Sequence, residues 1–210
     1  MTFNQFAKEV HQNAVAHGWY DPEPNIHEIF ALIHSEWSEA LEEYRDDHPM
    51  VWHACMDCGE ICKLPCDHAD APDQCDANMR DPKPEGVAVE LLDGCLRIMD
   101  FIGYSIYLEP DEDFDSVIRV SDESPETRES LKNQSLPEFV SMMHMMTARA
   151  QIELLLSGGK DAQKAIPHLM MILICTFAWL EVNGIEDPKT LMLKKHEYNK
   201  NRPYKHGKII

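Results

Sequence analysis

Two pairs of carboxylates have the residue types and spacing best suited to chemistry in this chain of 210 residues. Glu36 and Glu39 form one pair, and Glu90 and Asp93 form the other. Residues three apart on a helix lie on the same face, so each pair can present its carboxylates together. Four carboxylates that converge between two helices repel one another and resist desolvation unless a cation compensates them. We expect that cation to be Mg²⁺, which prefers carboxylate oxygen and shares its remaining positions with water and phosphate.

The second pair lies in a segment that is apolar around most of its circumference. Its polar residues fall in one strip, formed by Glu90, Asp93, Arg97 and Asp100. Acids on a mostly buried helix have little reason to be there unless something binds them. The first pair has an ordinary alternative, because Glu36, Glu39 and Glu43 could form a solvated helix face. Asp93 has one as well, since it could pair with Arg97 one turn along the helix.

The C-terminal segment gathers cations in a chain whose formal net charge is -18. These cations are Lys194, Lys195, Lys200, Arg202, Lys205 and Lys208. Cations beside a metal site suit a polyphosphate substrate. A solubilising basic tail is the alternative, and it explains Asn199 and Arg202 less well than the terminal lysines. The acidic net charge argues against a nucleic-acid polymer as partner, because a phosphate backbone requires a basic surface.

The elements that would position these residues are helices. Apolar residues recur with helical period over 26–47, 85–108, 137–156, 162–182 and 188–200, and in a first segment that extends to about Trp19. The Asp21–Pro24 stretch ends the first helix, and Asn25 caps the second. Between 111 and 135 we expect a loop with a short helical turn around 114–120. Strand-like alternation of useful length is missing, so residues 1–210 should form one compact all-α domain.

The cysteines are concentrated in an insert, residues 48–84, which lacks sustained periodicity. Cys55 and Cys58 have the two-residue gap of a zinc knuckle, and further ligands could come from Cys62, Cys66, His68 and Cys75. A closed zinc site would give this core-poor insert rigidity and folding free energy. A loop with free thiols is the equal alternative.

The N-terminus lacks the continuous apolar core of a signal peptide. The most apolar run, 169–180, is shorter than the roughly 20 residues that cross a bilayer. We therefore expect a cytoplasmic protein without a membrane partner, whose cysteines are thiols or metal ligands rather than disulfides. Cys95 and Cys175 lie in apolar helical patterns and should be small core residues.

A faint echo links residues 33–40 with residues 143–150, and each segment precedes an almost wholly apolar helix. One interpretation is an internal repeat whose second copy lost its carboxylates, with Met146 and Arg149 at the positions of Glu36 and Glu39. The other is a pair of unrelated amphipathic helices, and the sequence favours neither.

The pattern ExxE on one helix and ExxD on the next resembles the MazG-like, all-α nucleoside-triphosphate pyrophosphohydrolases. Here it reads Glu36-Trp37-Ser38-Glu39 and Glu90-Leu91-Leu92-Asp93. The resemblance extends over residues 33–45 and over the C-terminal stretch 195–208, KHEYNKNRPYKHGK. It implies a four-helix-bundle core of MazG type. The chain departs from the family pattern in its long insert, 48–84, and in an additional helix pair, 137–183.

What the resemblance implies is hydrolysis between the α- and β-phosphates of a nucleotide, which yields a monophosphate and pyrophosphate. The implied Mg²⁺ ligands are Glu36, Glu39, Glu90 and Asp93, and Mn²⁺ should be able to replace Mg²⁺. Glu39 is the candidate for orienting the attacking water. The resemblance also implies that phosphate or sugar contacts Lys195, Asn199 and Arg202. Family members pack as homodimers or homotetramers, so we expect self-association.

Because the long insert and the additional helix pair depart from the family pattern, the choice among ribo- and deoxyribonucleoside triphosphates stays open. A specialised substrate such as dUTP, dCTP or phosphoribosyl-ATP would be cleaved by the same chemistry. The alternative from another class is a non-catalytic binding or regulatory protein, in which the acids hold a structural cation and the insert recognises a partner. Two complete acid pairs favour the enzyme.

Overall fold

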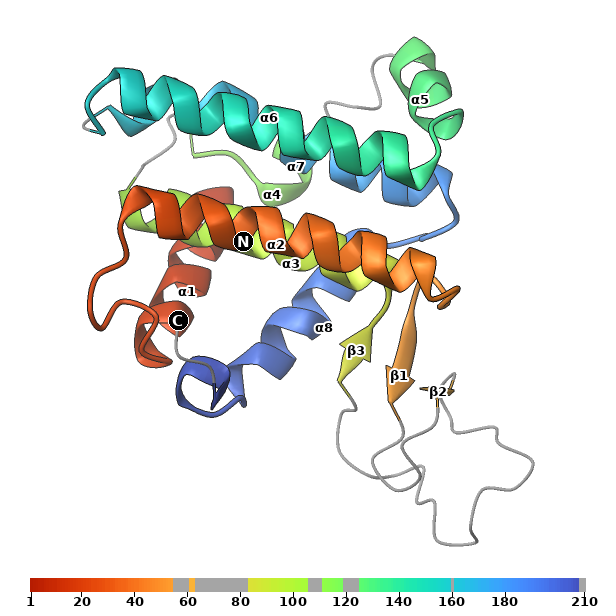
Figure 1. Cartoon of the computed structure of the whole chain (residues 1–210), viewed down its shortest axis with the longest axis horizontal. Helices are drawn as coiled ribbons and strands as arrows, with labels where there is room; N and C mark the ends of the chain where they lie inside the picture. Colours follow the sequence, from red (N-terminus) through yellow and green to blue (C-terminus); the bar gives the residue numbers. More distant parts are fainter. Residues whose placement is uncertain (55–60, 63–82, 106–110, 119–124, 160, 208–210) are drawn as a thin grey trace, which may run out of the picture.

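The computed structural model describes residues 1–54, 61–62, 83–105, 111–118, 125–159 and 161–207. Eight α-helices in these ranges build a body of three tiers (Figure 1). In this view the upper tier holds α6 (Leu136–Leu156) and α7 (Ile166–Val182), and the middle tier holds α2 (Ile26–Arg45) and α3 (Val87–Ser105). Below them lie α1 (Phe3–Ala16) and α8 (Pro188–Lys200). The expected all-α fold class is confirmed.

Helix α3 is the central element, as its nearly continuous apolar sequence predicts. It contacts α1, α2, α7 and α8, and it buries residues on almost every side. Gly94 permits the closest approach of α2, because a Cβ atom placed there would lie 2.2 Å from Cζ3 of Trp37. The buried surroundings of α3 leave its polar strip as the place where charged groups meet.

The start and the rotation of α2 follow from its sequence. The Asn25 side chain accepts hydrogen bonds from the backbone N–H groups of His27 and Glu28, at 2.9 and 3.1 Å, and Glu28 caps the Asn25 N–H in return. This reciprocal cap fixes the first turn. The buried stripe of α2 contains Phe30, Ile33, Trp37 and Ala40. Burial of this stripe turns Glu36 and Glu39 toward α3.

Helices α2 and α6 meet through the residues that the sequence echo aligns. The rings of His34 and His144 stack at 5.1 Å with their Nδ1 atoms 2.8 Å apart, and burial lowers the pKa of both. Trp37 Nε1 donates a hydrogen bond to Thr147 Oγ1 at 3.0 Å. Such pairing of equivalent positions is compatible with a repeat whose two helix pairs pack on each other. The repeat itself stays a prediction.

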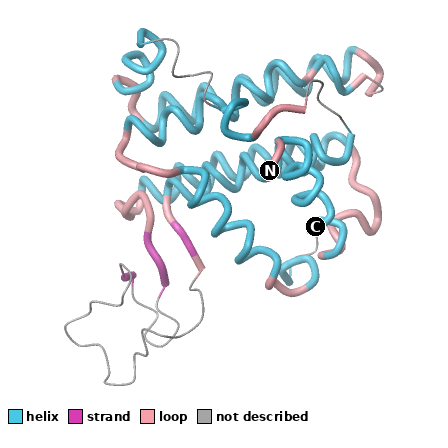
Figure 2. Tube along the Cα trace, turned by 180° about the vertical axis from the view of Figure 1, so that it is seen from behind, coloured by secondary structure: helices cyan, strands magenta, loops and turns pink. Residues whose placement is uncertain are grey.

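Two segments differ from the sequence-based expectation. Helix α5 (Pro125–Lys132) lies in the stretch expected to be a loop, whereas the expected short turn is α4 (Phe114–Ile118). The insert is less irregular than expected, since β1 (Trp52–Ala54) pairs antiparallel with both β2 (Ile61–Cys62) and β3 (Pro84–Glu85). The sheet projects from one end of the helical body (Figure 2). Strands of two and three residues are too short to show alternation in a sequence.

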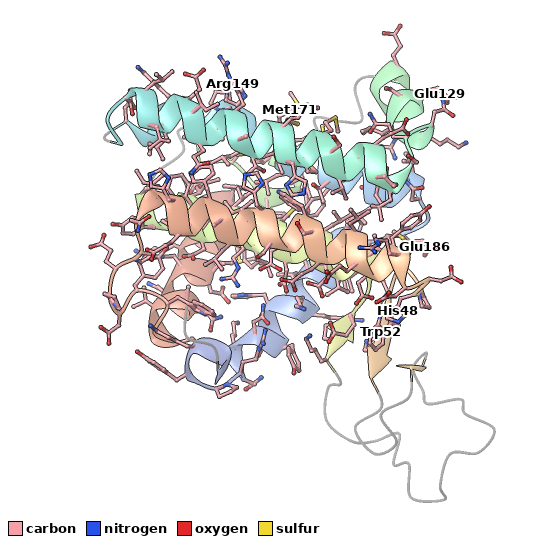
Figure 3. The ribbon with its side chains drawn as sticks, viewed as in Figure 1. His48, Trp52, Glu129, Arg149, Met171 and Glu186 are labelled. Carbon is pink, nitrogen blue, oxygen red and sulfur yellow. The ribbon has the colours of Figure 1, made fainter. Side chains whose placement is uncertain are left out.

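The base of this sheet is attached to the C-terminal end of α2 (Figure 3). Glu43 Oε2 accepts a hydrogen bond from Trp52 Nε1 at 2.7 Å and lies 3.0 Å from His48 Nδ1. Glu43 therefore binds residues at the base of the sheet and does not join the two predicted carboxylate pairs. The zinc interpretation falls on Cys55, Cys58, Cys62 and Cys66, whose side chains lie outside the described part of the chain.

The remaining cysteine and membrane expectations concern described residues. Cys95 and Cys175 are buried and unbridged, which confirms them as small core residues. Within the described ranges, every helix is too short or too polar to span a membrane. Two short 3₁₀ turns, Ala162–Lys164 and Tyr204–Gly207, complete the described elements.

Candidate metal centre

The antiparallel packing of α2 against α3 brings three of the four predicted acids together. Glu36, Glu39 and Glu90 each offer a carboxylate oxygen, and the three oxygen atoms lie within 4.8 Å of one another. The side chains of Glu36 and Glu90 are buried, at 5% and 6% exposure, whereas Glu39 is only half-buried. Across the described residues this is the one group of three or more such side chains close enough to hold a metal, and we call it the acid cluster.

Asp93 lies one turn farther along α3 and is held by α8 instead. Its Oδ2 atom is 3.0 Å from Lys195 Nζ, and its Oδ1 atom accepts a hydrogen bond from Asn199 Nδ2 at 3.3 Å. Two of the three residues expected to contact substrate therefore touch an acid of the predicted metal set. The packing of α8 against α3 produces this contact.

Lys195 is almost wholly buried, with 1% of its surface exposed. Its Nζ atom also donates to the carbonyl oxygen of Pro84 at 3.4 Å and lies 3.9 Å from Glu90 Oε1. Burial alone would lower the pKa of Lys195, but the neighbouring Asp93 and Glu90 outweigh burial and raise it. The side chain is a permanent cation beside the acid cluster.

Arg97 is the second internal cation of the centre. Its Nε donates to Glu36 Oε1 at 2.9 Å, and its guanidinium lies 5.0 Å from the centroid of the Trp19 ring. The direct ion pair of Arg97 thus goes to α2 rather than to Asp93, the alternative that the sequence left open. The nearby acids hold the pKa of Arg97 above its usual range despite burial.

The remaining negative charge makes ionisation of the buried acids costly. Burial raises the pKa of Glu36, and it raises the pKa of Glu90 to about 8; Arg97 and Lys195, respectively, oppose this effect. Asp93 raises the pKa of both glutamates further. Four carboxylates and two cations leave two uncompensated negative charges when every group is ionised. Three converging hard oxygen donors with this charge fit one Mg²⁺ or Mn²⁺ ion.

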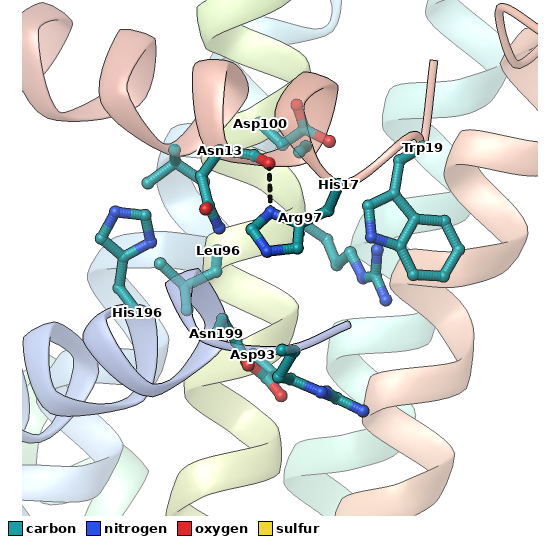
Figure 4. Close-up of a pocket in the computed structure, with 12 residues that line it drawn as sticks. Asn13, His17, Trp19, Asp93, Leu96, Arg97, Asp100, His196 and Asn199 are labelled. Carbon is teal, nitrogen blue, oxygen red and sulfur yellow. Dashed lines mark hydrogen bonds between the residues drawn. The ribbon is translucent and has the colours of Figure 1, made fainter. Parts of the chain in front are cut away.

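A cavity adjoins the centre between α1, α3 and α8 (Figure 4). It is an open hollow, and its free space of about 500 Å³ includes the solvent at its mouth. Asp93, Arg97 and Asn199 form its border with the acid cluster. The rest of its lining comes from Val10, Asn13, Ala14, His17, Trp19, Leu96, Asp100, His196 and Arg202.

Asn199 presents an unused hydrogen-bond acceptor at this border. Its Nδ2 donates to the carboxylate of Asp93, while its buried Oδ1 has no partner within the described part of the chain. A carboxylate paired with an ammonium accepts hydrogen bonds and cannot donate them, so this orientation of the amide is fixed. A ligand at Oδ1 must therefore bring a donor, such as a hydroxyl or amino group.

The other C-terminal cations are only partly directed at the centre. Arg202 lines the cavity. Lys200 pairs with Glu9 at 2.7 Å, and Lys205 Nζ donates to the carbonyl oxygen of Asp21 at 2.7 Å. Lys194 is exposed, and Lys208 lies outside the described residues. Much of the basic segment is thus tied to the protein itself.

The positions that correspond to the acids in the second helix pair do not form a comparable centre. Arg149 is exposed on α6 and pairs with Glu153 at 2.6 Å (Figure 3). Met146 packs at the edge of the hydrophobic core.

Sequence reasoning did not assign a role to the cavity residues contributed by α1 and the loop after it. Trp19 appeared only as the end of a helical pattern, and Asn13 and His17 carried no recognisable spacing. Asp100 was part of the polar strip of α3, which was the available signal. These residues meet only because α1 packs across α3.

Comparisons with known proteins found no relative of this chain. A scan against models of protein families, a search of curated proteins and a search of solved structures each found no match. The functional conclusion therefore rests on the geometry of the centre and the cavity, and the resemblance to MazG-like enzymes stays a prediction.

Proposed function

We propose that this chain is a Mg²⁺-dependent nucleotide pyrophosphohydrolase, which cleaves between the α- and β-phosphates of a nucleoside triphosphate. The observation that carries this proposal is the convergence of Glu36, Glu39 and Glu90 beside an open cavity with a partly polar lining. A metal-binding acid cluster next to a partly polar cavity suits a ligand that joins a polyphosphate to an organic group.

The proposed roles of the three glutamates follow from how deeply each side chain is buried. Glu36 and Glu90, which are buried, hold Mg²⁺ from opposite helices, and Glu39 completes the set. Bound Mg²⁺ supplies neutralisation of phosphate charge and lowers the pKa of a water ligand. Glu39 is the most exposed of the three, so it is the residue that orients the attacking water and accepts its proton. Arg97 holds Glu36 in place through its ion pair.

The nucleoside part of the substrate occupies the cavity between α1, α3 and α8. Arg202 lies at the cavity and binds phosphate through its fork of donors. The unpartnered Oδ1 of Asn199 accepts a hydrogen bond from a sugar hydroxyl, because phosphate oxygen has no proton to donate at neutral pH. Asn199 is thus assigned to sugar rather than to phosphate.

The proposal covers ribo- and deoxyribonucleoside triphosphates, and specialised substrates such as dUTP, dCTP and phosphoribosyl-ATP follow the same chemistry. It also includes a homodimer or homotetramer in the cytoplasm, as the resemblance implies. Sedimentation velocity of the purified chain tests self-association, and a monomer at all concentrations would remove that part alone.

Product analysis tests the proposed reaction directly. The purified protein is incubated with Mg²⁺ and a panel of ribo- and deoxyribonucleoside triphosphates, and the nucleotide products are separated by ion-exchange chromatography. We expect nucleoside monophosphate and pyrophosphate in equal amounts, and we expect EDTA to abolish both. Diphosphate with inorganic phosphate would indicate another cleavage site. A complete lack of turnover across the panel would contradict the enzyme.

One observation favours a second candidate, a non-catalytic metal-stabilised binding protein. Arg97 and Lys195 already compensate two of the four carboxylates Glu36, Glu39, Glu90 and Asp93, so the centre is partly a structural ion-pair network. This candidate predicts saturable binding of metal and nucleotide without turnover. Isothermal titration with a non-hydrolysable triphosphate analogue, run beside the product assay, separates the two functions.

A further inference from the structure

Lys195 places its ammonium group beside two acids of the predicted metal set, Asp93 and Glu90. Its ammonium group lies 3.0 Å from Asp93 Oδ2 and 3.9 Å from Glu90 Oε1, and only 1% of its side chain is exposed. The carbonyl oxygen of Pro84 accepts a hydrogen bond from the same nitrogen at 3.4 Å. Three acceptors from β3 and α3 thus surround an ammonium that has three donors.

We infer that Lys195 is a built-in counter-cation, which keeps Asp93 from binding metal and limits the centre to one divalent ion. The inference rests on the proposed function, because it presupposes a metal at Glu36, Glu39 and Glu90. It assigns Lys195 a positioning role on Asp93, in place of the phosphate contact that the family resemblance implies.

The occupancy of Asp93 is the first support for this role. Asn199 donates to one carboxylate oxygen and Lys195 pairs with the other, so α8 engages both oxygen atoms. A metal at Asp93 would have to displace the ammonium of Lys195, whose side chain is only 1% exposed. Removing one partner of such a buried pair leaves the other uncompensated, which is strongly unfavourable.

Charge balance is the second support. Arg97 pairs with Glu36 in the same way that Lys195 pairs with Asp93, so one acid on α2 and one acid on α3 each have an internal cation as partner. The two charges that remain match one divalent ion. A second ion would give the buried centre a net positive charge before any substrate binds, and low-dielectric surroundings penalise such an excess.

Burial is the third support, because it separates Lys195 from lysines that bind phosphate. A lysine that contacts a triphosphate must be accessible to it, yet Lys195 is only 1% exposed and does not line the cavity, whereas Arg202 and Asn199 do. The neighbouring Lys194 is exposed on the same helix and provides a matched control for charge removal.

Counting bound Mn²⁺ tests the inference without relying on activity. Electron paramagnetic resonance measures free Mn²⁺ during titration of the metal-free protein in the absence of nucleotide. We expect one Mn²⁺ per chain in the wild type and in Lys194→Met. Lys195→Met should bind a second Mn²⁺, because Asp93 becomes available, and Lys195→Met/Asp93→Asn should return to one.

The outcomes separate this inference from the proposed function. Two Mn²⁺ ions in the wild type, or one in a folded Lys195→Met variant, would overturn the counter-cation role and leave the enzyme intact. Lack of saturable Mn²⁺ binding in the wild type would remove the metal centre itself. If Lys195→Met does not fold, Lys195→Gln, which removes the charge but keeps hydrogen-bond donors for Asp93 and the carbonyl oxygen of Pro84, takes its place with the same expected count of two Mn²⁺ ions.

Discussion

The buried carboxyl of Glu90 makes the stability of the metal-free protein depend on pH in an unusual direction. Burial raises its pKa to about 8, Lys195 opposes the rise, and Asp93, Glu36 and Glu85 add to it. In the unfolded chain the same carboxyl returns to its ordinary value of 4.5. Between these two values the folded protein keeps a proton that the unfolded chain has lost.

The sign and size of the effect follow from this difference in proton binding. Because the folded state binds more protons, the free energy of unfolding falls as pH rises through this window, and stability is highest on the acid side. One full proton corresponds to about 1.4 kcal/mol per pH unit. From about pH 6 to about pH 7.5, Glu90 should therefore remove about 2 kcal/mol of stability.

Urea denaturation followed by tryptophan fluorescence measures this loss in the presence of EDTA. Glu90→Gln keeps the shape of the side chain without its titration, so subtracting the variant cancels the histidines and other acids. We expect the wild type to lose about 2 kcal/mol more than the variant over this interval. Mg²⁺ should stabilise the wild type more at the higher pH, where less of the carboxyl is protonated. Equal pH dependence in the two proteins would refute the assignment.

Three further substitutions test the packing that positions the centre, each by comparison with the wild type. Gly94→Ala places a Cβ atom against the ring of Trp37, so urea unfolding should show a loss of about 1–3 kcal/mol, although alanine favours a helix. Unchanged stability would mean that the ring can move. Asn25→Ala removes the acceptor for two backbone N–H groups and should cost about 1 kcal/mol in the same assay, whereas Asn25→Ser should retain most of the cap. Trp52→Phe breaks the bond to Glu43, and hydrogen exchange should then accelerate in β1 while α2 stays protected; equal exchange in β1 would show that this bond does not hold the sheet.

The helical architecture could be read from the sequence where local signals agree with burial. The Asn25 cap and the stripe from Phe30 to Ala40 predicted α2 closely, and the apolar run of α3 predicted its central place. Helix α5 was missed because its sequence, PETRESLK, has little apolar periodicity, although Pro125 at its start and Lys132 at its end are helix signals. The strands were missed because long-range pairing, rather than alternation, defines elements this short.

The sequence predicts only the part of the metal centre that depends on which residues share a helix face. Spacing placed Glu36 beside Glu39 and Glu90 beside Asp93, and the antiparallel packing of two helices brought three of these acids together. Spacing cannot say which cation approaches which acid. The pairing of Asp93 with Lys195 depends on how α8 docks on α3, a contact between residues about a hundred positions apart that no local pattern encodes.

The most direct test of the central claim compares two glutamates on α2. Glu39 belongs to the acid cluster, whereas Glu42, three residues farther on, is exposed and has the same charge. Release of pyrophosphate from a nucleoside triphosphate is measured with Mg²⁺ for the wild type, Glu39→Gln and Glu42→Gln. The structure predicts a loss of at least about 100-fold for Glu39→Gln and wild-type turnover for Glu42→Gln. Equal turnover by all three proteins would contradict an active centre at Glu36, Glu39 and Glu90.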